Sequence, residues 1–259
     1  LSSSKKSGIF LSINDNGGRR FRLPSGSRLL YKYYPLSAYS SHEGLHLLKP
    51  SSYHIYLKPE QGYAEGWIAR GSMTFDSFAR VFSLLLSELL SAHGLFYLHS
   101  ACLSDRSGNG WLICGWPKSG KTTLSLGFIG AGFSYLSDDA VLLKRMGRRR
   151  IESLSLRKAI RVKSKNGGKR SLLPESVSAG SYIGQCVPAV LIHSSLSRKR
   201  NSSLVPIAPS RAFVGLIPQS FQILSSMAAE EHSLVLKDLS SQCVSFELHA
   251  GTDLLRSPE

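Results

Sequence analysis

A short stretch near the middle of the chain, GWPKSGKT at residues 115–122, fits the phosphate-loop (Walker A) pattern G-x-x-x-x-G-K-[ST]. Backbone N–H groups in such a loop point at a β-phosphate, and the positive end of the following helix adds to the attraction. Gly115 and Gly120 allow backbone angles and close approaches that a side chain would block. The stretch therefore predicts a nucleotide site, which could serve hydrolysis, switching or phosphoryl transfer.

The residue types of this loop predict which groups hold ATP and Mg²⁺. Lys121 would reach the β- and γ-phosphates, and the Thr122 hydroxyl would ligate Mg²⁺. Pro117 should stiffen the loop, and we expect the bulky residues beside it, Trp116 and Lys118, to shape the access of the nucleotide or the acceptor to the site. The predicted nucleotide-binding residues are Gly115, Trp116, Pro117, Lys118, Ser119, Gly120, Lys121, Thr122 and Thr123. The alternative is a chance match, but an apolar run precedes the stretch and a helical pattern follows it, as the motif requires.

Two consecutive carboxylates, Asp138 and Asp139, lie 16 and 17 residues after Thr122, at the end of the next predicted strand. The carboxyl ends of neighbouring strands in a parallel α/β sheet meet at one crevice. Because side chains alternate along a strand, adjacent aspartates face different points unless the strand is ending there. One carboxylate would suit the metal and the other the phosphate acceptor. The alternative is an ordinary strand-to-turn boundary, where aspartate is common.

The sequence favours phosphoryl transfer over a switch or a mechanical ATPase. Those two classes usually need further parts, such as a guanine-specificity N-K-x-D loop or an Asp or Glu that closes a long hydrophobic Walker B strand, and the sequence has no N-K-x-D loop. A general base beside a metal ligand instead fits transfer to a hydroxyl, because the base can take the acceptor's proton. His99 lies 22 residues before Lys121, and a lone histidine of this kind is more often a core residue than a catalyst.

The elements that must position these residues can be read from apolar periodicity. Residues 1–73 read as a small β-rich module, with strands expected at 8–13, 20–23, 53–57 and 66–70. A helix is expected from Thr74 to Gly94, because apolar residues recur at three- and four-residue steps. Its expected apolar face comprises Phe75, Phe78, Phe82, Leu85 and Leu89. We place a domain boundary here, with an α/β catalytic domain at residues 74–259.

The catalytic domain is expected to alternate strands and helices. The apolar runs at 95–103 and 111–116 read as a hairpin or as adjacent strands, and a helix should follow the glycine-containing loop as far as residues 130–132. A strand at 133–143 meets the two aspartates. Further strands are expected at 160–163, 189–196 and 243–249, and helices at 210–217 and 227–240.

The net charge of +15 departs from the average soluble protein, whereas 42% hydrophobic and 19% charged residues are ordinary. Residues 144–170 hold 12 Lys or Arg against one acid, Glu152. Such a segment attracts polyanions, namely nucleic acid, an acidic peptide or the phosphates of ATP, and the alternative is a solvated basic loop. No RNA-binding signature, zinc finger or basic zipper is visible, which weakens nucleic-acid binding without excluding it.

The four cysteines lack C-x-x-C spacing, which argues against a zinc site or a disulfide framework and suits a reducing cytosol. No apolar run reaches about 18 residues, so we expect no membrane span. The first residues also lack the apolar core of a signal peptide. These features predict a cytoplasmic protein.

Residues 95–145 resemble the catalytic domain of HPr kinase/phosphorylase and its kinase-like relatives, a family similar in its core to phosphoenolpyruvate carboxykinase. The shared pattern is a histidine segment, a strand, the glycine loop, a helix with small residues and a strand closing in Asp-Asp. Looser similarity extends to about residue 225, where residues 205–221 resemble the proline-led helix of these relatives. The resemblance implies a P-loop kinase core of this type behind the β-rich module.

The resemblance implies a role for each site residue. Lys121 would bind phosphate and Thr122 would bind Mg²⁺, while Asp139 would be the base that deprotonates the acceptor hydroxyl. Asp138 would hold the metal or orient its neighbour, and His99 would assist the transferred phosphoryl group. The chain departs from the family in two ways. The family's downstream glutamate signature is not recognisable here, and the residues WPK replace smaller or acidic loop residues.

Relatives of this kind include free-serine kinases and kinases of ribosomally made peptides, among them lasso peptides. The resemblance therefore implies an ATP- and Mg²⁺-dependent serine kinase acting on a peptide or protein, such as a lasso-type precursor. Lys169 and Arg170, in a loop expected at 166–174, would clamp phosphates of the acceptor. The alternatives are a kinase of free serine or a sugar, and a nucleotide-dependent sensor with a basic binding surface. HPr kinases proper are hexameric, so an oligomer is also considered.

Overall fold

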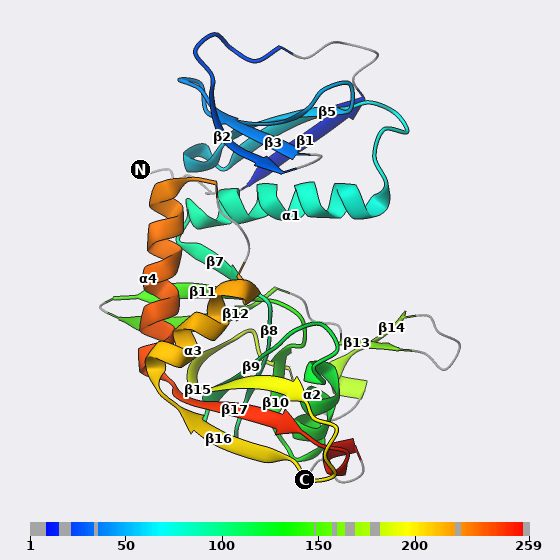
Figure 1. Ribbon diagram of the computed structural model, residues 1–259, viewed down its shortest axis with the longest axis vertical. Helices are drawn as coiled ribbons and strands as arrows, with labels where there is room; N and C mark the ends of the chain where they lie inside the picture. The colour runs from blue at the N-terminus through cyan, green and yellow to red at the C-terminus, as the bar shows by residue number, and fades with distance from the viewer. Residues whose placement is uncertain are drawn as a thin grey trace, which may run out of the picture. The chain divides into compact units, whose positions relative to one another are not determined.

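The structure of the chain, a computed structural model, describes residues 9–15, 22–33, 36–147, 149–156, 160–163, 169–176, 182–220 and 224–255. It is a mixed α/β fold that divides into two compact units. Unit 1 comprises Leu1–Leu95 with Gln222–Glu231, and unit 2 comprises Phe96–Phe221 with His232–Glu259. Figure 1 labels most helices and strands of both units.

Unit 1 is built on a six-stranded sheet. In sheet order its strands are β1 (Phe10–Asp15), β6 (Tyr63–Ile68), β5 (Tyr53–Lys58), β4 (Leu45–Lys49), β3 (Leu36–Ser40) and β2 (Arg28–Tyr33), with a 3₁₀ turn η1 (Pro59–Gln61) before β6. β1 pairs with β6 in parallel, and the other pairs are antiparallel. The strands expected at 8–13, 53–57 and 66–70 are β1, β5 and β6. The strand expected at 20–23 lies partly outside the described residues, and residues 22–23 are not in a strand.

The helix α1 (Phe75–Ser91) covers one face of this sheet (Figure 1). Thr74 caps its start, as predicted, because its hydroxyl accepts the Ser77 N–H at 3.3 Å. Leu85 and Leu89 are buried in a common core with apolar residues of β3–β6. The predicted apolar face is wrong at Phe75, which is 84% exposed. Since α1 shares its core with the six-stranded sheet, it belongs to unit 1, and the division falls after Leu95 and not after residue 73.

Unit 2 is built on a branched nine-stranded sheet in which the long strand β15 is the junction. One path contains β10 (Ser134–Ser137), β8 (Ser100–Ser104), β9 (Asn109–Cys114), β15 (Gln185–Leu196), β17 (Val244–Ala250) and β16 (Ser203–Ile207). The branch from the start of β15 contains β12 (Arg150–Ser155), β11 (Val141–Met146) and β7 (Leu95–Leu98). β15 is parallel to β9 and β17, whereas β8 and β9 form the antiparallel hairpin that the sequence predicts as one option.

The helices of unit 2 are close to their predicted positions. They are α2 (Lys121–Gly130), α3 (Pro209–Leu216) and α4 (Ser226–Gln242), the last of which begins in the part of the chain assigned to unit 1. The remaining elements are β13 (Ile160–Lys163), β14 (Lys169–Leu172), η2 (Pro174–Ser176), η3 (Ile217–Gln219) and η4 (Asp253–Leu255). α2 packs on β8 and buries Leu124 and Ile129 against the sheet.

The strand expected at 133–143 is two strands, β10 and β11, separated by a bend that holds the aspartate pair. The described part of the basic segment 144–170 also differs from the solvated loop that was one alternative. It contributes residues to β11, β12, β13 and β14. Within it, Arg145 donates to Asp238 at 2.6 Å, so one of these cations is paired inside the fold.

All four cysteines are free and buried in unit 2. The Sγ atoms of Cys102 and Cys186 lie 3.5 Å apart, and mutual contact and burial raise the pKa of Cys102. Among the described residues, no helix is both long and apolar enough to span a bilayer.

His232 makes the stability of unit 2 depend on pH. Its ring is 4% exposed and stacks on Phe96, with 5.1 Å between ring centroids. Burial lowers the pKa of His232 from 6.5 to about 4, opposed by a hydrogen bond to the Tyr97 backbone. Above pH 6.5 the ring is neutral in the folded and the unfolded chain. As the pH falls from 6.5 to about 4, the unfolded chain binds the proton first, so stability is lost across this window.

We expect His232 to lower the free energy of unfolding by about 3 kcal/mol on going from pH 7 to pH 4. Urea unfolding of the wild type and His232→Phe at both pH values measures this contribution. The variant should lose less stability than the wild type by this amount. Equal losses in both proteins would contradict the assignment.

Candidate nucleotide site

The predicted site residues gather at one edge of the unit 2 sheet. β8 runs antiparallel to both β9 and β10, so β9 and β10 run in the same direction and end at the same edge, where β8 begins. β9 ends in the loop of residues 115–120, called here the glycine loop, and β10 ends in the aspartate bend. His99 immediately precedes β8. The ends converge as predicted, although β8 lies between the two strands.

The glycine loop has a backbone conformation that brings it close to β15. Lys118 and Gly120 have φ values of 70° and 92°, a left-handed region that is rare for a residue with a side chain. A Cβ added at Gly115 would collide with the Ser119 hydroxyl and would lie 2.5 Å from the Ser194 carbonyl oxygen. Only glycine therefore fits at residue 115 with the loop and β15 at this separation.

Ser194 of β15 is a loop-supporting residue that the sequence analysis did not identify. Its hydroxyl donates to the Cys114 carbonyl at 3.1 Å and lies 3.0 Å from the Ser119 hydroxyl. All three residues are buried. A signal was present, because two serines follow the apolar run of β15 at the carboxyl end of a parallel strand.

Lys121 is the first residue of α2 and lies beneath the glycine loop. It is only 8% exposed, and its Nζ donates to the carbonyl oxygens of Gly115 at 2.7 Å and Trp116 at 3.3 Å. Burial lowers the pKa of the Lys121 ammonium, while Cys114 and Asp139 act to raise it. A charged group this buried is usually paired with an opposite charge, whereas these hydrogen bonds of Lys121 Nζ go to neutral carbonyls. The loop therefore holds a cation that suits an anionic ligand.

His99 and Asp139 are in direct contact. His99 Nδ1 lies 2.7 Å from the Asp139 carbonyl oxygen and 3.4 Å from its Oδ1. A carbonyl only accepts, so Nδ1 carries the proton in the neutral ring. Burial and the charge of Lys121 lower the pKa of His99, and Asp139 opposes the shift. His99 therefore acts as a neutral donor that fixes the backbone of Asp139.

The two aspartates turn to different surroundings, as the alternation rule predicts. Asp138 is 4% exposed and accepts a hydrogen bond from the Tyr135 hydroxyl at 3.0 Å. The side chain of Asp139 is 45% exposed and lies on the side of His99 and Lys121. A carboxylate that is half-exposed beside a cation can meet a substrate, whereas a buried one bonded to a tyrosine is held in place.

The remaining predicted residues lie at or near the mouth of the glycine loop, with one exception. Trp116 is 67% exposed, and Pro117, Lys118 and Thr123 are also exposed. Thr122 is partly buried in the first turn of α2. The exception is the pair Lys169 and Arg170, which lie in β14, paired with β13, and not in the predicted loop. Their side chains are outside the described part of the structure.

The donor set suits a nucleotide with Mg²⁺. The N-terminus of α2 and the left-handed loop turn present backbone amides to an anion, and Lys121 adds a fixed charge. Mg²⁺ in such sites takes one or two protein oxygens together with phosphate oxygens. Thr122 and Asp138 stay the predicted protein ligands. Among the described residues, no three His, Cys, Asp or Glu side chains cluster to hold a metal by themselves.

The chain shows a distant similarity to a solved kinase/phosphatase structure. It matches no known family model and no curated protein. Among solved structures it is similar to the Hpr(Ser) kinase/phosphatase from Coxiella burnetii, with 19% sequence identity and a TM-score of 0.34. The match covers 54% of this chain and 93% of that chain.

Proposed function

We propose that unit 2 is an ATP- and Mg²⁺-dependent kinase domain with a P-loop core, which transfers the γ-phosphoryl group of ATP to a serine hydroxyl of a peptide or protein. The observation that carries the proposal is the meeting of Lys121, His99 and Asp139 from separate segments at one sheet edge, beside a glycine loop. Asp139 is close enough to raise the pKa of Lys121, and its side chain is 45% exposed, so an acceptor hydroxyl could reach it. A carboxylate in this place can serve as a general base.

Each residue has a physical task in this proposal. The glycine loop and Lys121 bind and neutralise the phosphates, which is the largest catalytic contribution in phosphoryl transfer. ATP with Mg²⁺ supplies the transferred group and its charge compensation. The Asp139 carboxylate accepts the proton of the attacking serine hydroxyl. His99 acts as a positioning residue, because its Nδ1–H holds the Asp139 carbonyl at 2.7 Å.

An acceptor screen by mass spectrometry tests the proposal. The full chain is incubated with Mg-ATP in three separate samples. The first contains a pool of serine-containing peptides, the second free serine and the third a sugar mixture. We expect one added phosphoryl group on a peptide serine, and none when serine is replaced by alanine. Phosphate on free serine or a sugar would indicate a small-molecule kinase. Added phosphate on no acceptor would favour the nucleotide-dependent sensor, and either result would overturn the proposal.

Trp116 provides a prediction about access to the site. Its ring is 67% exposed at the mouth of the glycine loop, where an aromatic face can stack on a base or on an acceptor side chain. We expect Trp116→Ala to weaken binding of ATP or of the acceptor by about fivefold. Calorimetric titration measures both affinities, with Leu204→Ala as a control because Leu204 is also exposed, at 54%, on β16. If both affinities stay at the control's values, Trp116 has no role in access.

A further inference from the structure

The six-stranded sheet of unit 1 ends in β1, whose outer edge carries main-chain N–H and C=O groups that face away from the sheet. β1 pairs only with β6 among the described strands. The Phe10 N–H donates to the Gly62 carbonyl at 2.7 Å, so Phe10 and every second residue after it face β6. The main-chain groups of Leu11 and Ile13 consequently face the other way. An edge of this kind is a template for a further strand.

The two edges of this sheet differ in their protection. β2, at the opposite edge, carries the cations Arg28 and Lys32, and charged side chains are a common defence against strand addition. β1 has the sequence FLSIND, with no lysine, arginine or proline. The one charged residue of β1, Asp15, is at its end, so Phe10–Asn14 carry none of these blocking residues, whereas β2 carries two cations.

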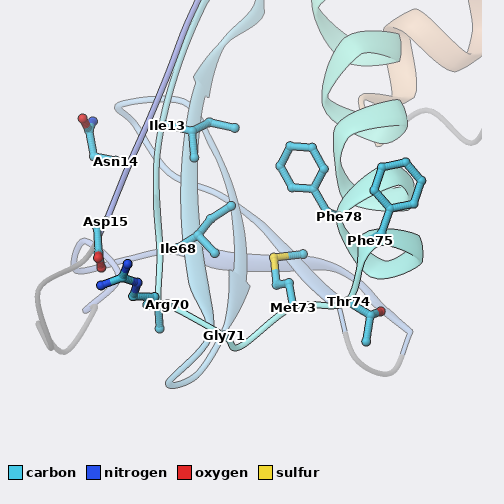
Figure 2. Close-up of a pocket in the computed structure, with 11 residues that line it drawn as sticks. Ile13, Asn14, Asp15, Ile68, Arg70, Gly71, Met73, Thr74, Phe75 and Phe78 are labelled. Atoms are coloured by element: carbon cyan, nitrogen blue, oxygen red, sulfur yellow. The ribbon is translucent and has the colours of Figure 1, made fainter.

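A pocket of about 450 Å³ opens beside this edge, between the end of β1, the end of β6 and the start of α1 (Figure 2). Ile13 and Ile68 project from the sheet toward Met73 and Phe78. Phe75 completes the apolar lining and is 84% exposed. The pocket therefore lies at the end of the apolar layer between the sheet and α1. This end is open because β1 is the last strand of the sheet.

We propose that unit 1 binds an extended polypeptide segment as an additional strand beside β1, with apolar side chains of that segment in the pocket. An added strand would lie about 4.8 Å from β1, and every second side chain would point to the face that α1 covers. Those side chains would meet Ile13, Phe75 and Phe78. The main-chain edge selects a polypeptide, because only a polypeptide presents N–H and C=O groups at the matching repeat.

The polar residues at the rim of the pocket fit the same partner. Asp15, at the end of β1, and Arg70, just beyond β6, both line the pocket, and Figure 2 draws them on the side away from Phe75 and Phe78. An added strand that passes Ile13 would reach them after its apolar positions. We therefore expect the segment to alternate apolar and polar residues and to contain no proline.

The inference goes beyond the proposed function, because it concerns binding by unit 1 and involves no nucleotide. Lack of phosphoryl transfer would leave it standing, and lack of peptide binding would leave the kinase proposal standing. The two proposals can therefore fail separately.

The test is NMR of the full ¹⁵N-labelled chain titrated with a short synthetic peptide in which valine and threonine alternate. One control peptide has the same composition with its valines adjacent, and another is N-methylated at alternate positions. We expect the alternating peptide to shift the Leu11 and Ile13 amide resonances and to slow their hydrogen exchange by about tenfold. The control peptides should leave both amides unchanged.

Two variants locate the binding. Phe75→Asp removes apolar lining from a position that is 84% exposed, so the fold should persist and peptide affinity should fall by about tenfold or more. Ile13→Pro removes an outward donor without removing a bond to β6, and should have a similar effect. Met227→Asp is the matched control, since Met227 is 69% exposed in unit 1 and does not line the pocket. The proposal would be overturned if neither variant weakened peptide binding, or if the peptide shifted other amides and not those of Leu11 and Ile13. Pairing of β1 with a second copy of the chain in place of the peptide, or no peptide binding at all, would also overturn it.

Discussion

Replacement of Lys121 by alanine is expected to weaken Mg-ATP binding by about 100-fold or more, the largest single effect on affinity in this chain. Lys121 is 8% exposed and its ammonium is held by the Gly115 and Trp116 carbonyls, so a neighbouring residue cannot replace its charge by a small shift. Hydrogen bonds from a cation to phosphate are among the strongest in proteins, and loss of two of them accounts for this magnitude. Isothermal titration calorimetry measures the change directly.

Lys118 supplies the matched control for this experiment. It belongs to the same loop and carries the same charge, but it is exposed at the loop's mouth. We expect Lys118→Ala to change the affinity for Mg-ATP much less than Lys121→Ala. Equal effects of the two variants would mean that the loop attracts nucleotide by overall charge alone. Unchanged affinity in Lys121→Ala, with the fold intact by circular dichroism, would contradict the nucleotide site itself.

Replacement of Asp139 by asparagine is expected to separate binding from transfer. The asparagine amide has nearly the same shape, so the bond from His99 to the backbone carbonyl of residue 139 should survive. It cannot accept the hydroxyl proton at neutral pH, and loss of a general base costs about 10²–10⁴-fold in rate. We expect Mg-ATP affinity within about threefold of wild type and phosphoryl transfer reduced by this factor.

Asp138→Asn is the comparison that makes the Asp139 result specific. Asp138 is buried and bonded to Tyr135, and it is the predicted metal ligand. Its variant should raise the Mg²⁺ concentration needed for half-maximal transfer, whereas Asp139→Asn should reduce transfer at every Mg²⁺ concentration. If Asp139→Asn transferred phosphate at the wild-type rate, another residue would be the base.

Local patterns made the parts of the site predictable. The glycine loop, the start of α2 and the cap of α1 at Thr74 depend on residues within one or two turns of each other, and the structure has them where the sequence places them. The split between Asp138 and Asp139 also follows from alternation at a strand end. Such features need no knowledge of the rest of the fold.

Long-range pairing explains what the sequence did not predict. The support of the glycine loop by Ser194 joins residues 75 positions apart, and only the parallel pairing of β9 with β15 brings them together. β2, β3 and β4 escaped prediction because runs such as RLLYKY and LHLLK mix apolar and polar residues without clean alternation. The expected boundary at residue 73 differs from the observed division after Leu95 for a related reason. Only the shared core shows that α1 belongs with the strands before it.

The most direct test of the kinase proposal is ³¹P NMR of Mg-ATP with the full chain and the serine-peptide pool, followed over time in one sample. We predict that the γ-phosphate resonance of ATP falls while a phosphoserine ester resonance rises in equal amount, and that both changes are about 100-fold slower or more with Asp139→Asn. Growth of inorganic phosphate alone, or an unchanged γ-phosphate resonance with the wild-type chain, would contradict phosphoryl transfer to serine as the function of this site.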